Sequence, residues 1–324
     1  MEVDIRMKAI ETPVQVLYVI GYGRSGSTLL DILLGNHPKV EGVGELAVLP
    51  HSGWIGGPVT RSSICACGRR VADCPFWSAV RREWVARVGE EGIERYPELQ
   101  NAFEKNRWWP RLLRECLWPS PRYLDYARYT QALFAAIRAT SGKEVVVDSS
   151  KRPLRAFTLS GMPGVDLRVV HLVRDGRGVV SSRKKVLRKD EEAGVTRDIR
   201  RRPALTSTLL WTGINVLSEL IMLRLDPEKA VRVRYEDLVE DPKGVLGEIG
   251  RMAGLDLSGP AEEVLRGGAV EVGHNVGGNR LRMTKGGVRL RPDAGSWRGT
   301  LSAGEQRFYW ALAGWLTRRY GYKK

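Results

Sequence analysis

Short runs of apolar and β-branched residues recur along the chain, and each is predicted to form a buried strand. The runs are Val16–Ile20, Glu144–Asp148, Leu167–Val173 and Val231–Arg234. Most of their positions are apolar, as expected for strands of a parallel sheet that is covered on both faces. Long helical patterns separate the runs and can supply the crossovers that parallel strands need. We therefore expect an α/β fold, a parallel β-sheet wrapped by helices.

The helical patterns are long and apolar at regular intervals, at Tyr123–Thr140, Leu205–Arg224 and Ala303–Tyr320. Residues 50–121 differ, because they are rich in Gly, Pro, Cys and Trp and have no strand period. We interpret them as a helical and loop insertion of a single domain, 1–324, and as a candidate lid over an acceptor site. Five of its tryptophans could form a sugar-stacking pocket, although a core position is favoured for most of them: Trp54, Trp77, Trp108, Trp109 and Trp118.

Composition adds a charge argument. The chain has 324 residues, of which 43% are hydrophobic and 27% charged, and its net charge is +15. Such an excess favours an anionic partner, although a basic surface without one is an equal alternative. No apolar run approaches the length of a membrane span, and the N-terminus has no signal-peptide pattern. We expect no transmembrane segment and a cytoplasmic location.

A glycine-rich turn follows the first strand, in the segment Gly21–Thr28, and the helical pattern Leu29–Leu34 comes next. A strand, a glycine-rich turn and a helix together point backbone N–H groups and the positive helix end at an anion. The predicted phosphate ligands are Gly23, Arg24, Ser25, Gly26, Ser27, Thr28 and Leu29. The turn is not a Walker A motif, which requires a lysine after the last glycine. An ordinary turn without a ligand is the alternative.

A second basic segment follows the third strand. Arg174 stands at the carboxyl end of that strand, where α/β sheets bind ligands, and Ser182 lies eight residues later. Two helical turns bring the Ser182 hydroxyl toward the same anion. Alone, Arg174 is as well explained as a salt-bridge partner. Together with the first turn it indicates a ligand with two separated phosphate groups.

These segments resemble those of PAPS-dependent sulfotransferases (PAPS is 3′-phosphoadenosine 5′-phosphosulfate). The stretch Gly21–Leu30 is similar to the family's 5′-phosphosulfate loop, and Arg174 with Ser182 is similar to its 3′-phosphate motif. The segment Arg234–Leu238 with Asp241-Pro242 resembles the family's YEDL…DP segment, in which the residue matching Tyr235 lies near the adenine. The segments Gly278–Arg282 and Ser296–Arg298 resemble bacterial and carbohydrate-type members, and this match implies Arg282 in donor binding.

The resemblance implies a P-loop-like fold and transfer of a sulfuryl group from PAPS, with release of PAP (adenosine 3′,5′-bisphosphate). The acceptor would be a hydroxyl of a carbohydrate, a small alcohol or phenol, or a tyrosyl group, and no nucleic-acid partner is implied. The motif Asn36-His37-Pro38 with Glu45 is similar to the tyrosylprotein and carbohydrate branches, in which an acidic residue acts as base. Glu45 is thus the predicted base, with a capping or ion-pairing role as the alternative.

Side-chain cations are expected to replace a metal at the reaction centre. Arg24 and Lys151 are the candidates for the transferring group, because Lys151 follows a buried strand and reaches the same edge of the sheet. No metal is required for this chemistry. Two other classes stay open, a P-loop kinase for a small molecule and a nucleotide- or polyanion-binding protein without catalysis.

Two further features carry no assigned role. Cys65, Cys67 and Cys74 cluster in sequence without the paired CxxC spacing of a zinc site. Free thiols are the favoured state, with a Cys67–Cys74 disulfide and a zinc site completed by His51 as alternatives. The basic stretch 183–202 is expected to be a solvated loop.

Overall fold

Five parallel strands form one sheet in the computed structural model, which describes residues 13–56, 63–105, 112, 114–115, 118–184, 201–290 and 297–324. The strands are β1 (Val14–Ile20), β2 (Val40–Gly42), β3 (Val145–Asp148), β4 (Val165–Val173) and β5 (Ala230–Arg234), in the order β2-β3-β1-β4-β5. The expected α/β fold is confirmed, and β1, β3, β4 and β5 correspond to the four predicted strands. The sequence analysis missed β2, because three residues carry too little periodicity.

The register of the sheet aligns the carboxyl ends of its strands. β1 pairs with β3 from Gln15↔Val145 to Tyr18↔Asp148, and with β4 from Val14↔Val165 to Ile20↔His171. All four strand pairings are parallel, so the segments that follow β1, β3, β4 and β5 leave the same edge of the sheet. The glycine-rich turn, Lys151, Arg174 and Tyr235 all lie in these segments.

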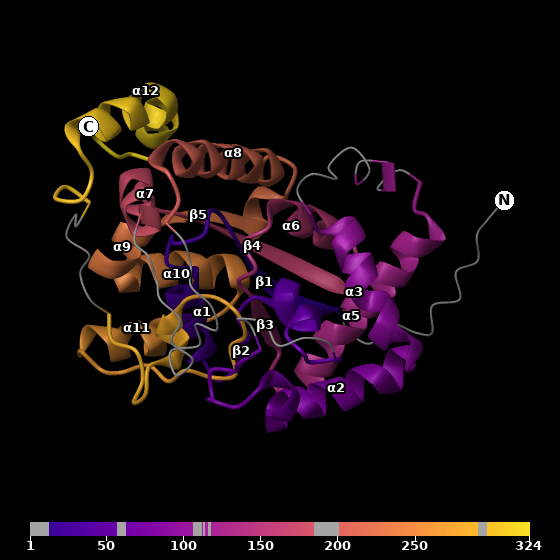
Figure 1. Ribbon diagram of the computed structural model, residues 1–324. Helices are drawn as coiled ribbons and strands as arrows, with labels where there is room; N and C mark the ends of the chain where they lie inside the picture. Colours follow the sequence, from indigo (N-terminus) through magenta and orange to yellow (C-terminus); the bar gives the residue numbers. More distant parts are fainter. Residues whose placement is uncertain are drawn as a thin grey trace.

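Alternate residues of β1 face two different hydrophobic cores. Val16, Tyr18 and Ile20 pack on the side of helices α2 (Pro75–Val88), α3 (Glu91–Phe103), α5 (Pro121–Ser141) and α6 (Pro153–Ser160). Leu17 and Val19 pack on the side of α1 (Ser27–Gly35), α10 (Pro242–Ala253) and α11 (Ser258–Leu265). This alternation follows from the two-residue period of a strand and covers both faces of the sheet (Figure 1).

A third core joins the remaining long helices, α7 (Gly176–Lys184), α8 (Ala204–Met222) and α12 (Ala303–Arg319). These three helices lie together at one end of the molecule (Figure 1). The short helix α9 (Tyr235–Glu240) follows β5, and 3-10 turns occupy Leu46–His51, Val71–Asp73, Pro227–Lys229 and Arg280–Met283.

Within the described residues, α8 is the one helix long and apolar enough to cross a membrane by length and composition alone. The sequence predicts this helix as Leu205–Arg224, but not as a candidate membrane span. In the structure α8 packs on the domain through Trp211, which is buried, and through Asn215, which hydrogen-bonds His171 Nε2 of β4 at 3.0 Å. Its inner face therefore makes the contacts of a helix that covers a core.

The described part of the 50–121 segment packs α2 and α3 against α5. Trp54 and Trp77 are buried in this core, as expected, whereas Trp118 is 71% exposed. Trp108 and Trp109 lie outside the described residues. The buried indoles make this segment an integral part of the core on that face of the sheet.

Candidate active site

The glycine-rich turn has the backbone shape of an anion-binding loop. Gly21 and Gly26 have φ values of +130° and +92°, and a Cβ at Gly21 would lie 2.4 Å from the carbonyl oxygen of Leu172. Helix α1 begins at Ser27, and the first amides of a helix have no partner inside it. The side-chain oxygen of Ser25 is buried and has no hydrogen-bond partner within the described residues. A buried hydroxyl and unpaired amides at a helix N-terminus together fit a phosphate or sulfate group.

The second basic segment meets this turn, as the sequence predicts. Arg24 Nε donates a hydrogen bond to Ser182 Oγ at 2.9 Å, and Arg174 Nη1 donates to the carbonyl oxygen of Arg24 at 2.9 Å. The Arg174 guanidinium also lies over the ring of Tyr235, 4.6 Å from its centroid. Three segments that are far apart in sequence thus place their polar groups together at the carboxyl edge of β1 and β4.

The ring of Tyr235 packs against Gly26 of the turn. A Cβ at Gly26 would lie 2.2 Å from the Tyr235 ring, so only glycine allows this approach. Burial raises the pKa of the Tyr235 phenol above its ordinary value, and the phenol therefore stays neutral at neutral pH. The next residue, Glu236, is anchored by the amide of Asp175 at 3.1 Å and by the Tyr322 hydroxyl at 2.5 Å. These bonds fix α9 against the start of α7.

Glu45 lies near the phosphate loop, because the chain turns back toward it after α1. The chain extends through β2, bends at Gly44 with a φ of +79°, and the Glu45 amide donates to the carbonyl oxygen of Val276 at 2.8 Å. A Cβ at Gly278 would lie 2.8 Å from Thr28 Oγ1 and 3.6 Å from Glu45 Oε1. Glu45 and the first turn of α1 therefore flank the same glycine.

Lys151 is the ion-pair partner of Glu45. Its Nζ donates to Glu45 Oε1 at 2.5 Å and to the carbonyl oxygen of Ser149 at 2.9 Å. Both side chains are mostly buried, with exposures of 15% for Lys151 and 14% for Glu45. The Lys151 backbone has a φ of +61°, which is strained for a residue with a side chain, and its amide is held by the carbonyl oxygen of Val19 at 3.1 Å.

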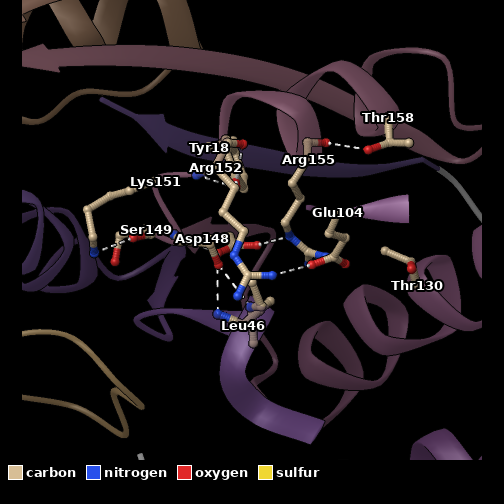
Figure 2. A network of polar contacts seen from close by, with 12 residues as sticks. Tyr18, Leu46, Glu104, Thr130, Asp148, Ser149, Lys151, Arg152, Arg155 and Thr158 are labelled. Carbon is tan, nitrogen blue, oxygen red and sulfur yellow. Dashed lines mark hydrogen bonds and ion pairs between the residues drawn. The ribbon is translucent and has the colours of Figure 1, made fainter. Parts of the chain in front are cut away.

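Asp148, the last residue of β3, ties the Glu45 segment to the Lys151 segment (Figure 2). Its Oδ1 accepts hydrogen bonds from the amides of Leu46 at 3.3 Å and Ser150 at 3.0 Å. The Ser150 hydroxyl donates to the same oxygen and accepts a bond from the Ala47 amide at 2.9 Å. One buried carboxylate thus positions the residues beside the candidate base and beside its lysine.

Arg155 binds the second carboxylate oxygen of Asp148 (Figure 2). Its Nε donates to Asp148 Oδ2 at 3.0 Å and its Nη1 donates to Glu104, and all three side chains are fully buried. Glu104 also accepts from the Tyr126 hydroxyl at 3.0 Å and pairs with Arg152 at 3.4 Å. Burial raises the pKa of Glu104, and the charge of Arg155 opposes that rise. The sequence analysis missed this network, because Glu104 comes from the insertion and no local pattern marks it.

Two other candidate residues, Arg282 and His37, make contacts outside the two anion-binding segments. Arg282, implied by the resemblance in donor binding, is 3% exposed and donates to the carbonyl oxygen of Ile64 at 2.7 Å. Its side chain contacts Ile64, the residue before Cys65, and Met283, and its role in donor binding stays a prediction. His37 Nδ1 accepts a hydrogen bond from the Lys39 amide at 3.2 Å, directly after the end of α1.

The three clustered cysteines lie together with His274, and not with His51, which the zinc alternative to free thiols would have used. The ligand atoms of Cys65, Cys67, Cys74 and His274 all lie within 4.8 Å of one another. His274 is 200 residues from Cys74 in sequence, so spacing could not reveal it. Cys116, Ser296 and most of the basic stretch 183–202 lie outside the described residues.

A parallel sheet with an anion-binding turn after β1 and a second basic segment after β4 defines a P-loop-like α/β protein. The profile of the sulfotransferase family matches residues 17–259, which is most of the chain. The chain belongs to the sulfotransferase family, and sulfuryl transfer is the activity of that family.

Solved structures with the same architecture are also sulfotransferases. The sulfotransferase domain from the curacin biosynthetic pathway is 16% identical, with a TM-score of 0.50, and the match covers 95% of this chain and 99% of that one. The sulfotransferase domain from the Synechococcus PCC 7002 olefin synthase is 21% identical, with a TM-score of 0.49 and 97% of both chains covered. At 16% identity, the likeness to the curacin-pathway domain speaks for the fold alone. No curated protein matches the chain.

Proposed function

We propose that the protein transfers the sulfuryl group of PAPS to the hydroxyl of an acceptor molecule. The observation that carries the proposal is the meeting of two anion-binding segments at one sheet edge, where Arg24 bonds Ser182 and Arg174 bonds the backbone of Arg24. A donor with a 5′-phosphosulfate and a separate 3′-phosphate requires two such segments. ATP would require only the first, together with the lysine of a Walker A motif, which this turn lacks.

Donor binding divides between the two segments. The turn Gly23–Leu29 supplies amides, the unpartnered Ser25 hydroxyl and the Arg24 guanidinium for the 5′-phosphosulfate. Arg174 and Ser182 supply a charged fork and a hydroxyl for the 3′-phosphate. The Tyr235 ring, stacked under Arg174, offers an aromatic face for the adenine.

Glu45 is the proposed general base. The acceptor oxygen attacks sulfur in line with the bond to the 5′-phosphate, one S–O bond forms, and the old S–O bond breaks. The bonding pair leaves with PAP, and the acceptor proton passes to Glu45. Its Oε1 faces Lys151, and its Oε2 has no hydrogen-bond partner within the described residues, so Oε2 is the atom available to the acceptor proton.

Lys151 and Arg24 are the proposed cations of the reaction. Charge develops on the equatorial and leaving oxygens during an in-line displacement of this kind, and fixed cations stabilise it. Lys151 lies between Glu45 and the carboxyl end of β3, so the same ammonium can orient the base and neutralise the sulfuryl oxygens. Side chains thus supply the positive charge, and the transfer step is proposed to need no metal.

The acceptor is proposed to be a carbohydrate, a small alcohol or phenol, or a tyrosyl group, and a cytoplasmic location suits the donor. The test is a screen with ³⁵S-labelled PAPS over these four acceptor classes, run in parallel with γ-labelled ATP. Labelled product from PAPS and none from ATP supports the proposal. Phosphorylated product that depends on Mg²⁺ would replace it with a kinase.

A further inference from the structure

A cluster of three thiols and one imidazole lies outside the proposed reaction centre. The Cys65 sulfur is 3.7 Å from His274 Nδ1, the Cys74 sulfur is 3.3 Å from the same nitrogen, and the Cys67 and Cys74 sulfurs are 3.6 Å apart. All four ligand atoms fall within 4.8 Å of one another.

These distances are close to the edges of a zinc tetrahedron. Zn–S bonds of about 2.3 Å and Zn–N bonds of about 2.0–2.1 Å give tetrahedral edges of about 3.8 Å between sulfurs and about 3.6 Å between sulfur and nitrogen. The three separations given above differ from these edges by about 0.3 Å or less. Three cysteines and one histidine are also a common donor set of closed, structural zinc sites.

We propose that Cys65, Cys67, Cys74 and His274 bind one structural Zn²⁺ ion. The ion would join a loop of the 50–121 segment to the segment that follows α11. It would take no part in sulfuryl transfer, because all four tetrahedral positions are filled by protein ligands and none is open to a substrate.

The fold holds the cysteine ligands in place independently of any ion. Cys65 and Cys67 lie in a tight turn, in which the Gly68 amide donates to the Cys65 carbonyl oxygen at 2.9 Å and the Cys65 amide donates to Arg69 at 2.8 Å. Cys74 is the residue directly before α2, so its sulfur lies at the positive end of that helix. A thiolate is stabilised at such a position.

The orientation of His274 is also fixed by its neighbours. Its ring stacks on Phe76 with the centroids 4.9 Å apart and the planes 6° apart, and its carbonyl oxygen accepts from Trp77 Nε1 at 2.8 Å. The Ala66 amide donates to the carbonyl oxygen of Asn275 at 3.0 Å. The stacked ring and the anchored backbone together place Nδ1 beside the sulfurs of Cys65 and Cys74.

Arg282 supplies the charge balance that such a site needs. Three thiolates, one neutral imidazole and Zn²⁺ carry a net charge of about −1. Arg282 is 3% exposed and donates to the carbonyl oxygen of Ile64, the residue before Cys65, and its Nε has no hydrogen-bond partner within the described residues. A buried guanidinium beside the cluster offsets that negative charge.

The cluster is connected to the candidate active site through a short stretch of chain. Directly after His274, Asn275 donates to Asp31 of α1, and Val276 pairs with the backbone of Val43 and Glu45. The Asn279 amide then donates to Thr28 Oγ1 at 3.1 Å. Zinc would thus anchor the segment that lies against Glu45 and Thr28.

The experiment measures the metal in the full-length protein after the affinity tag is removed. Protein dialysed against a mild chelator is expected to retain about one zinc per chain by inductively coupled plasma mass spectrometry. In Cys74→Ser and His274→Gln, the zinc content per chain is expected to fall at least fivefold. The matched controls, Cys116→Ser and His51→Gln, are expected to retain their zinc. Loss of zinc in His51→Gln, with retention in His274→Gln, would overturn the ligand assignment.

A second measurement on the unmodified chain covers the case in which a variant does not fold. Cobalt exchanged into the wild-type protein is expected to give the intense visible absorption of tetrahedral, thiolate-ligated Co²⁺. The zinc-loaded protein is expected to unfold at a higher temperature than protein stripped with a strong chelator. Wild-type protein without metal, or with a Cys67–Cys74 disulfide in its peptide map, would refute the site.

Discussion

The buried ion-pair network behind the reaction centre makes a quantitative prediction for Glu104→Gln. Asp148, Glu104 and Arg155 are fully buried, and Arg152 is about one-third exposed. Two carboxylates and two guanidiniums leave this group with no net charge, and the substitution leaves it with one uncompensated positive charge. The glutamine carbonyl can still accept the bond from the Tyr126 hydroxyl, so the change removes charge and keeps shape.

The size of the effect follows from the burial. Removing one partner of a buried ion pair costs about 3–5 kcal/mol of the free energy of unfolding. At about 2 °C per kcal/mol, the value for larger domains, the melting temperature should fall by about 6–10 °C. Because Asp148 positions Leu46 and Ser150, we also expect kcat to fall.

The assay is urea unfolding followed by tryptophan fluorescence, with Glu98→Gln as the matched control. Glu98 lies on the same helix, α3, with its side chain exposed, and its substitution should change the free energy of unfolding by about 0.5 kcal/mol or less. A loss of less than about 1 kcal/mol in Glu104→Gln would show that the network does not carry the proposed charge compensation.

Three further predictions concern the base, the metal and the pH. Glu45→Gln should lower kcat by about 10²–10⁴-fold with little change in PAP affinity, whereas the exposed control Glu271→Gln should not, and an unchanged kcat would assign the base elsewhere. Transfer should proceed in EDTA without added Mg²⁺, and a rate restored only by Mg²⁺ would contradict the role of the side-chain cations. Burial would raise the pKa of Glu219, but the nearby His171 ring and bonds from Arg232 and Arg319 hold that pKa below its ordinary value. That stabilisation is present above about pH 4.5 and is lost as the pH falls, so the roughly 1.5–3 kcal/mol difference in unfolding free energy between wild type and Glu219→Gln should shrink in acid. A difference that stays constant from pH 7 to pH 3 would refute this reading.

Much of the fold could be predicted, because strands that are buried on both faces are visible in the sequence as short apolar runs. The four predicted strands correspond to β1, β3, β4 and β5, whereas β2 has three residues and is paired with β3 alone. The parallel order also explains why the segments that carry Arg24, Lys151 and Arg174 leave the same edge of the sheet, since each follows a strand.

The missed parts depend on contacts between segments that are distant in sequence. Glu104 meets Arg155 across 51 residues, and His274 meets Cys74 across 200 residues. No local periodicity or motif spacing predicts such a contact, because it depends on tertiary packing alone. Arg282 is a further case, because a motif resemblance implies it in donor binding, its side chain donates to the carbonyl oxygen of Ile64, and its donor role stays a prediction.

The measurement that tests the central claim most directly is calorimetric titration of the wild-type protein and Arg174→Ala with PAP and with AMP. Two anion sites predict that PAP binds more tightly than AMP, which lacks the 3′-phosphate. Arg174→Ala should lose roughly 1.5–3 kcal/mol of PAP binding, about 10- to 150-fold in affinity, while AMP binding stays nearly unchanged. Equal affinity of the wild-type protein for PAP and AMP would contradict the binding of the donor at two anion sites. It would also contradict the proposal of sulfuryl transfer, which rests on those two sites.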